Sequence, residues 1–150
     1  MAGYGTMDSQ EVYVVFLIGS KEYGIAIEFV SSILNPLGDY SLTEHFTIGT
    51  DSIKTNDGEV PLISFYELNN IKSPPHSERT RIIIAKSNDF KAAFYVEHVR
   101  DFISSDTKNS FNKERISIVE QPYIKWQIKY DNRYILLPDF NKILPEINQS

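Results

Sequence analysis

The chain has 150 residues, a formal net charge of −5 and no cysteine. Its 41% hydrophobic and 23% charged residues are typical of a folded protein and exclude global disorder. No apolar run approaches the roughly 20 residues that span a bilayer, and the lack of cysteine excludes disulfides and thiolate metal sites. The acidic balance opposes binding to nucleic acid, including oligonucleotides. Since the chain has no cysteine and residues 1–10 lack the pattern of a secretory signal, we expect a cytoplasmic protein with no direct membrane insertion.

The beginning of the chain predicts a leader followed by a hairpin. Residues 1–10 show no hydrophobic periodicity and are predicted to form a flexible leader, ahead of a single domain over 11–150. A β-branched and aromatic run at 12–18 and a second apolar segment at 23–27 flank a short turn. This pattern is typical of an antiparallel hairpin.

The next segments predict a short helix and a second hairpin. Apolar residues of 28–34 share one helical stripe and precede Pro36, so we expect a short helix there. Two strands, 46–54 and 59–65, flank Asn56-Asp57-Gly58, which is a strong signal for a tight turn.

The middle of the chain is predicted to hold one helical turn at 66–70 and a surface loop at 72–78, which carries Pro74 and Pro75. The second half then repeats the order of the first. We expect two further hairpins and a terminal helix, at 81–96, 124–137 and 139–147.

Two local resemblances within the chain indicate an internal duplication. Ile27–Val30 matches Val96–Val99 at an offset of 69, and the turn at Asp57 matches the turn at Asp131 at an offset of 74. We interpret them as two units of about 70 residues. Since a unit this small has a marginal core, the two are expected to pack face to face with a groove between them.

Catalytic and metal-binding motifs were sought by residue type and spacing. The histidines His45, His76 and His98 lack the spacing of a metal pair, and the seven glycines form no phosphate-binding loop. No catalytic residue, metal ligand or cofactor is predicted. A small hydrolase with its site in the groove stays open as the alternative from the enzyme class, although no nucleophile, base and oxyanion arrangement can be named.

Aromatic residues gather near the C-terminal end. Trp126 and Tyr130 alternate with Lys125 and Lys129 and are predicted to share one face of a strand. Large aromatics in this arrangement suit either a core or a binding surface, and both readings stay open.

Several segments also follow, in order, the pattern of a known family: Tyr13–Gly19, Glu22–Val30, Gly58–Ile63, Thr80–Ile84, Val96–Phe102, Tyr123–Lys125, Arg133–Leu137 and Lys142–Leu144. In these segments the chain resembles the CheW family of chemotaxis coupling proteins, from about Glu11 to Glu146. The resemblance implies a mainly β fold of two five-stranded SH3-like barrels around a shared apolar interface. The approximate halves are 11–71 and 80–147, with exchange of strands between them left open.

The resemblance further implies a non-enzymatic adaptor that couples methyl-accepting chemoreceptors to the regulatory domain of the CheA histidine kinase in membrane-associated arrays. An adaptor for another histidine-kinase pathway, or a competitor of the ordinary coupling protein, is the alternative. The residues implied for the groove that binds the receptor tip are Ile25, Ile27, Val30, Ile33, Val96 and Val99. Those implied for kinase binding are Asn56, Asp57, Gly58 and Glu59.

The chain departs from the family pattern at four positions. Asp57 stands where the family usually has arginine, Ser32 where it has glutamate, Ser64 where it has aspartate and Trp126 where it has glycine. A charge reversal can abolish an electrostatic contact, so we expect a divergent member whose partner set differs from that of a typical coupling protein.

Overall fold

The computed structural model describes residues 11–36, 46–68, 71–105 and 111–148. The predicted leader and His45 lie outside them. Within the described ranges no helix is long and apolar enough to cross a membrane. The elements are β1 (Val12–Ile18), β2 (Lys21–Ala26), the 3₁₀ helix η1 (Ile27–Phe29), β3 (Val30–Leu34), β4 (Phe46–Ile48), β5 (Ser52–Thr55), β6 (Gly58–Ile63), α2 (Phe65–Leu68), β7 (Arg81–Ser87), β8 (Phe90–Val96), β9 (His98–Ser104), β10 (Asn112–Arg115), β11 (Ile124–Tyr130), β12 (Arg133–Pro138) and α3 (Phe140–Asn148).

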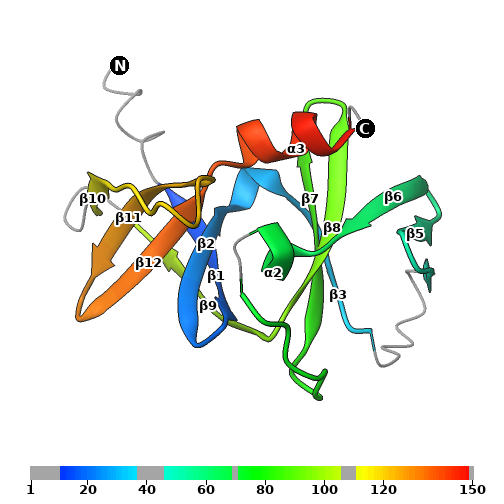
Figure 1. The fold of residues 1–150 in the computed structure, drawn as a ribbon, viewed down its shortest axis with the longest axis horizontal. Helices are drawn as coiled ribbons and strands as arrows, with labels where there is room; N and C mark the ends of the chain where they lie inside the picture. Colours follow the sequence, from blue (N-terminus) through cyan, green and yellow to red (C-terminus); the bar gives the residue numbers. More distant parts are fainter. Residues whose placement is uncertain (1–10, 37–45, 69–70, 106–110, 149–150) are drawn as a thin grey trace, which may run out of the picture.

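These strands form two curled sheets. The first has the order β10-β11-β12-β2-β1-β9 and the second the order β3-β7-β8-β6-β5-β4 (Figure 1). Each curls around its own interior cluster, and we call them the first and the second barrel. The predicted mainly β fold is confirmed, and each sheet has six strands where five were expected for each barrel.

The predicted helix at 28–34 is wrong. Only Ile27–Phe29 is helical, and Val30–Leu34 forms the edge strand β3, which pairs antiparallel with β7. The apolar stripe includes the β-branched residues Val30 and Ile33, which favour a strand when a partner strand can satisfy the backbone. The predicted hairpins, the helical turn and the terminal helix are confirmed.

The predicted strand 46–54 is divided into β4 and β5 by a turn in which the Gly49 N–H donates to the Ser52 carbonyl at 2.8 Å.

The two barrels have the same internal order. Both contain one parallel pair, β12 with β2 in the first barrel and β6 with β8 in the second. The matched segments Ile27–Val30 and Val96–Val99 lie where the chain crosses from one sheet to the other. Each sheet therefore takes strands from both halves of the sequence. The division of the chain into two subdomains at 11–71 and 80–147 stays a prediction.

The main core lies between the barrels. Phe65 of α2 is fully buried, and its ring centroid lies 5.8 Å from that of Phe16, 5.6 Å from Tyr23 and 5.1 Å from Phe94. Strands of both sheets and both α-helices contribute to this cluster. Burial of this apolar surface fixes the barrels against each other and positions the crossovers between them.

Candidate functional site

The six residues predicted for the receptor groove divide into core and surface residues. Ile25 and Val96 are 1% and 0% exposed and belong to the core between the barrels, so in this conformation they cannot contact a partner. Val30, Ile33 and Val99 are partly buried against the same core. Ile27, in η1, is 42% exposed.

A hollow of about 210 Å³ lies where the loop after Ile71 meets the β8–β9 crossover, next to Val96 and Val99. Leu17, Arg79 and His98 contribute to its lining. Burial lowers the pKa of His98, and the nearby guanidinium groups of Arg79, Arg81 and Arg100 lower it further. Burial and the basic neighbourhood thus both favour the neutral form of His98.

Glu97 holds the β8–β9 crossover in place. Its carboxylate accepts a hydrogen bond from the Gly19 N–H, and its own N–H donates to the Leu17 carbonyl at 3.0 Å. Burial raises the pKa of Tyr66, and the interaction of its hydroxyl with Glu97 raises it further. One carboxylate thus connects the first hairpin, α2 and the crossover.

The four residues predicted for kinase binding lie together on the β5–β6 turn and are all exposed. Gly58 has a φ of +127°, which strongly favours glycine. The Thr55 hydroxyl donates to the Gly58 carbonyl at 3.0 Å, and the Glu59 carboxylate accepts from the Ser52 hydroxyl at 2.9 Å. The turn is thus well defined, and Figure 1 shows it at the far side of the molecule from β10.

A charged cluster that the sequence analysis missed closes one end of the first barrel. Arg133 of β12 donates to Glu22 at 2.6 Å and makes two bonds of 2.9 and 3.0 Å to the Asp101 carboxylate. Arg100 pairs with the other Glu22 oxygen at 2.8 Å. The hydrogen bonds to Asp101 and then to Glu22 raise the pKa of Arg133. The cluster therefore joins β12, β2 and β9.

The other end of the first barrel has a smaller polar group. Lys113 of β10 donates to the Glu11 carboxylate at 2.9 Å and to the Tyr13 hydroxyl at 3.2 Å. Burial lowers the pKa of Lys113, but the bonds to Glu11 and Tyr13 outweigh it and the net shift is upward. Polar groups thus occupy both ends of this barrel.

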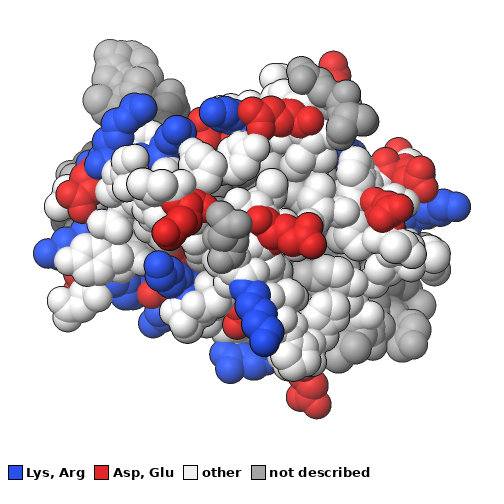
Figure 2. Space-filling model, in the orientation of Figure 1, with Lys and Arg blue, Asp and Glu red and all other residues white. Residues whose placement is uncertain are grey.

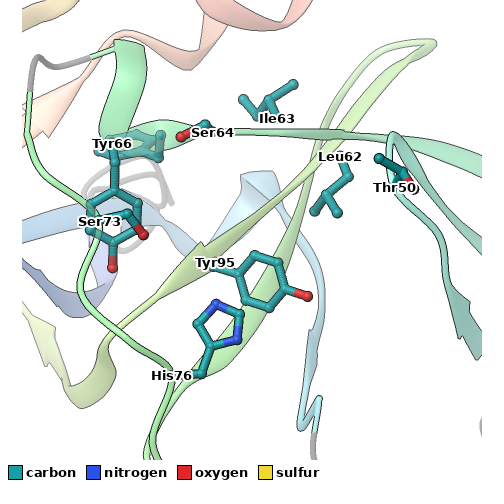
Figure 3. A pocket seen from close by; sticks show the side chains of 9 residues that line it. Thr50, Leu62, Ile63, Ser64, Tyr66, Ser73, His76 and Tyr95 are labelled. Atoms are coloured by element: carbon teal, nitrogen blue, oxygen red, sulfur yellow. The ribbon is translucent and has the colours of Figure 1, made fainter.

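The pocket shown in Figure 3, a hollow of about 200 Å³ in the second barrel, is lined by one histidine and two serines. His76 lies stacked on Tyr95, with ring centroids 4.3 Å apart. The Ser64 hydroxyl accepts the Glu67 N–H at 3.1 Å, and the Ser73 hydroxyl donates to the Pro74 carbonyl at 3.4 Å. Neither serine is hydrogen-bonded to the histidine, so this geometry does not form a nucleophile and base pair.

Among residues 11–36, 46–68, 71–105 and 111–148, no group of three His, Cys, Asp or Glu side chains could hold a metal ion. On the face shown in Figure 2, most of the surface is neither basic nor acidic, with basic side chains mainly on the left and acidic ones mainly in the middle and at the upper right. As a whole, this face suits protein contacts better than a single highly charged ligand.

The aromatic residues of β11 serve both roles that the sequence left open. Tyr130 packs against the interior of the first barrel, with its ring 5.9 Å from that of Phe111. Trp126 is 40% exposed, and the Arg115 guanidinium lies 5.6 Å from its ring centroid. Tyr130 is therefore a core residue, and Trp126 is available for contacts.

One sequence signal could have revealed the missed charged cluster. Glu22 alternates with Gly24 on β2, and Arg133 alternates with Ile135 on β12, so both charges are in phase with residues inside the barrel. Charges at such positions need partners, but Glu22 and Arg133 are 111 residues apart, and no local pattern pairs them.

Comparisons with known proteins agree with this architecture. The CheW-like domain family matches residues 12–148. The chain is 28% identical over 106 residues to a chemotaxis protein CheW of Helicobacter pylori; the match covers 68% of this chain and 63% of that protein, less than two thirds of its length. The crystal structure of scaffolding protein TtCheW from Thermoanaerobacter tengcongensis matches with a TM-score of 0.67 and 21% identity, over 87% of this chain and 84% of that one, which supports the fold. With the family match spanning both barrels, the chain belongs to the CheW-like domain family.

Proposed function

We propose that this protein is a non-enzymatic scaffold of a chemotaxis signalling complex, which couples methyl-accepting chemoreceptors to a CheA-type histidine kinase. The observation that carries the proposal is the match of the CheW-like domain to residues 12–148, across both barrels. A structural role for several polar side chains supports a scaffold, since Arg133, Lys113 and Glu97 hold strands and turns together. In this role the protein would be recruited to membrane-associated receptor arrays.

The receptor surface is proposed at the β2–η1–β3 crossover. Ile27 provides exposed apolar surface there, and Val30 and Ile33 are partly accessible on β3, which follows it. Val99 lies at the start of β9, opposite Phe16 near the other end of β1, and is left out of this surface. An amphipathic helix of a receptor tip would place an apolar stripe on such a surface. Ile25 and Val96 support these residues from within the core.

The kinase surface is proposed at the β5–β6 turn. Its residues are exposed, and Asp57 and Glu59 give it an acidic character. A partner with basic side chains opposite this turn would therefore be favoured. In this proposal the receptor and the kinase occupy different parts of the molecule.

The test is a pull-down with the purified protein, a receptor cytoplasmic fragment and the CheA-type kinase of the same source. We expect both to be retained. Ile27→Asp should lose the receptor and keep the kinase, because Ile27 is exposed and its replacement leaves the core intact. The matched control is Val119→Asp, since Val119 is 94% exposed and lies outside the proposed surfaces.

A second pair of variants tests the kinase surface. Asp57→Arg should lower kinase retention, because it reverses a charge that is proposed to face basic side chains of the kinase. Asp89→Arg, in the exposed β7–β8 turn, should leave kinase retention unchanged. If neither partner is retained by the folded protein, the coupling role is excluded.

A further inference from the structure

The hollow of about 210 Å³ beside the β8–β9 crossover combines apolar surface with basic side chains. Leu17 of β1 and two prolines of the loop before β7, Pro74 and Pro75, provide the apolar part. Arg79 and His98 line the same hollow. We call it the β8–β9 hollow, and it shares no lining residue with the receptor surface or the kinase surface proposed above.

The loop before β7 is held in place by its own hydrogen bonds. The Ser77 N–H donates to the Thr80 hydroxyl at 2.8 Å, and the Arg79 N–H donates to the Ser77 hydroxyl at 3.1 Å. The Nη1 group of Arg81 donates to the Glu78 and Thr80 carbonyls, both at 2.8 Å. These bonds fix the backbone that carries Arg79 at the β8–β9 hollow, and they use only one of the two terminal nitrogens of Arg81.

Three arginines from three elements surround His98. Burial is the main cause of its lowered pKa, and Arg79 of the loop, Arg81 of β7 and Arg100 of β9 each lower it further, with no carboxylate among the described groups that shift it. Arg100 pairs with Glu22 at 2.8 Å. Neither Arg79 nor Arg81 has a carboxylate at ion-pair distance among the described residues. Two guanidinium groups without an acidic partner therefore lie at this hollow, in a chain of formal net charge −5.

The acidic residue that lines the β8–β9 hollow is engaged elsewhere. The Glu97 carboxylate accepts the hydrogen bond from the Gly19 N–H and interacts with the Tyr66 hydroxyl. Within the described residues it makes no ion pair with Arg79 or Arg81. Glu97 thus holds the crossover in place, and the positive charge of the two arginines is left for a ligand.

We propose that the β8–β9 hollow binds a compact, free anion of the phosphate type, held by Arg79 and Arg81 with His98 beside it. Guanidinium groups bind phosphate through paired, charge-assisted hydrogen bonds, and an apolar wall strengthens such bonds by lowering the local dielectric constant. Pockets for drug-sized ligands have roughly 300–1,000 Å³, so a hollow of about 210 Å³ favours an anion as small as phosphate or pyrophosphate. This binding goes beyond the proposed scaffold function and does not depend on it.

The probe is pyrophosphate, with sodium chloride at the same ionic strength as the control for screening. NMR of the histidine side chains measures the pKa of His98, whose signals are assigned with His98→Gln. We expect pyrophosphate to raise the pKa of His98 saturably and further than chloride does, because a bound anion stabilises the imidazolium ion. His76 stacks on Tyr95 in a different pocket and should respond to both salts alike.

Arg79→Gln tests the proposed ligand directly. Arg79 is exposed, and the loop bond from its backbone N–H does not depend on its side chain, so the variant should fold. Calorimetry should show pyrophosphate binding weakened at least about tenfold, as expected for the loss of charge-assisted hydrogen bonds. The matched control is Arg115→Gln, which removes the same charge at an exposed position of β10 and should leave binding unchanged.

Three results would overturn the proposal. An equal rise in the pKa of His98 with pyrophosphate and with chloride would show screening alone. Equal affinity of the unmodified protein and Arg79→Gln for pyrophosphate would place the anion elsewhere. Equal weakening in Arg79→Gln and Arg115→Gln would show that net charge attracts the anion without a specific site.

Discussion

In the first barrel, Arg133 spans the interior from β12 to reach Glu22 and Asp101. In the second barrel, Gly58 stands at the position equivalent to Arg133, 75 residues earlier. Lys91 corresponds to Glu22, 69 residues later, and Ser32 corresponds to Asp101, 69 residues earlier. All four ion pairs of the described residues lie in the first barrel, whereas the interior of the second is an apolar cluster. One strand order thus accommodates two kinds of interior.

The two barrels also differ in how the space along equivalent strands is filled. On β2 the first barrel has Gly24 and Ala26; the side chains of Leu137, Ile135 and Tyr13 take the space beside Gly24, and Ala26 lines a pocket of about 230 Å³. The equivalent residues of β8 are Ala93 and Tyr95, which fill the second barrel with apolar volume. The small residues of β2 therefore let the apolar side chains of β12 pack closely in the first barrel.

The largest expected effect comes from removing the central cation. Arg133→Met keeps most of the apolar stem but leaves Glu22 with Arg100 alone and removes the cation that pairs with Asp101. Breaking a fully buried pair costs about 3–5 kcal/mol, but Asp101 is 40% exposed, so we expect a loss of about 2 kcal/mol in the free energy of unfolding. Urea denaturation at low salt measures it.

The matched control for that variant is Lys91→Met in the second barrel, at the position equivalent to Glu22. We expect a change within about 0.5 kcal/mol, as for a substitution away from a charged network. Equal losses for the two variants would show that the ends of the barrels do not differ energetically.

A smaller effect tests the space argument directly. A Cβ at Gly24 would lie 3.0 Å from Leu137 Cδ2 and 3.1 Å from Ile135 Cγ2, so Gly24→Ala overpacks the first barrel. We expect a loss of about 1–2 kcal/mol. The reverse change in the second barrel, Ala93→Gly, should lose about 1 kcal/mol through backbone entropy. A gain in thermal stability for Gly24→Ala would contradict the idea that Gly24 is needed for close packing.

The sequence predicted the hairpins and the duplication well because both rest on local signals. Asn56-Asp57-Gly58 forms the β5–β6 turn as its residue types require, and Gly58 has the positive φ that favours glycine. The apolar segment 28–34 was mistaken because a stripe with β-branched residues is ambiguous between helix and strand. Its pairing with β7, more than 45 residues away, decided the outcome.

The candidate site was less predictable than the fold. The exposure of Ile27 and the burial of Ile25 and Val96 depend on which residues the second sheet covers, and nothing in the local pattern distinguishes them. Arg133 was missed for a related reason, since its partners come from β2 and β9. The residue types indicate which side chains are apolar or charged. Which of these side chains come into contact depends on how the crossovers bring distant strands together in each sheet.

The smallest expected effect is on the pH dependence of stability, and it comes from a difference between the two crossovers. The β8–β9 crossover has His98 where the β2–β3 crossover has Phe29, 69 positions earlier. Because the pKa of His98 is lowered below its ordinary value of 6.5, the unfolded state binds more protons than the folded state as the pH falls through 6.5. This contribution to stability is therefore present above pH 6.5 and is lost as the pH falls below 6.5 toward the lowered pKa of His98 in the folded state. Glutamine does not titrate, so His98→Gln should lose less free energy of unfolding between pH 7 and pH 5 than the unmodified protein, as measured by urea denaturation. His98→Phe should show the same reduced loss as His98→Gln if the charge of His98 is the cause. The same loss in all three proteins would show that neither burial nor the nearby Arg79, Arg81 and Arg100 lowers the pKa of His98, and would make the two crossovers electrostatically equivalent.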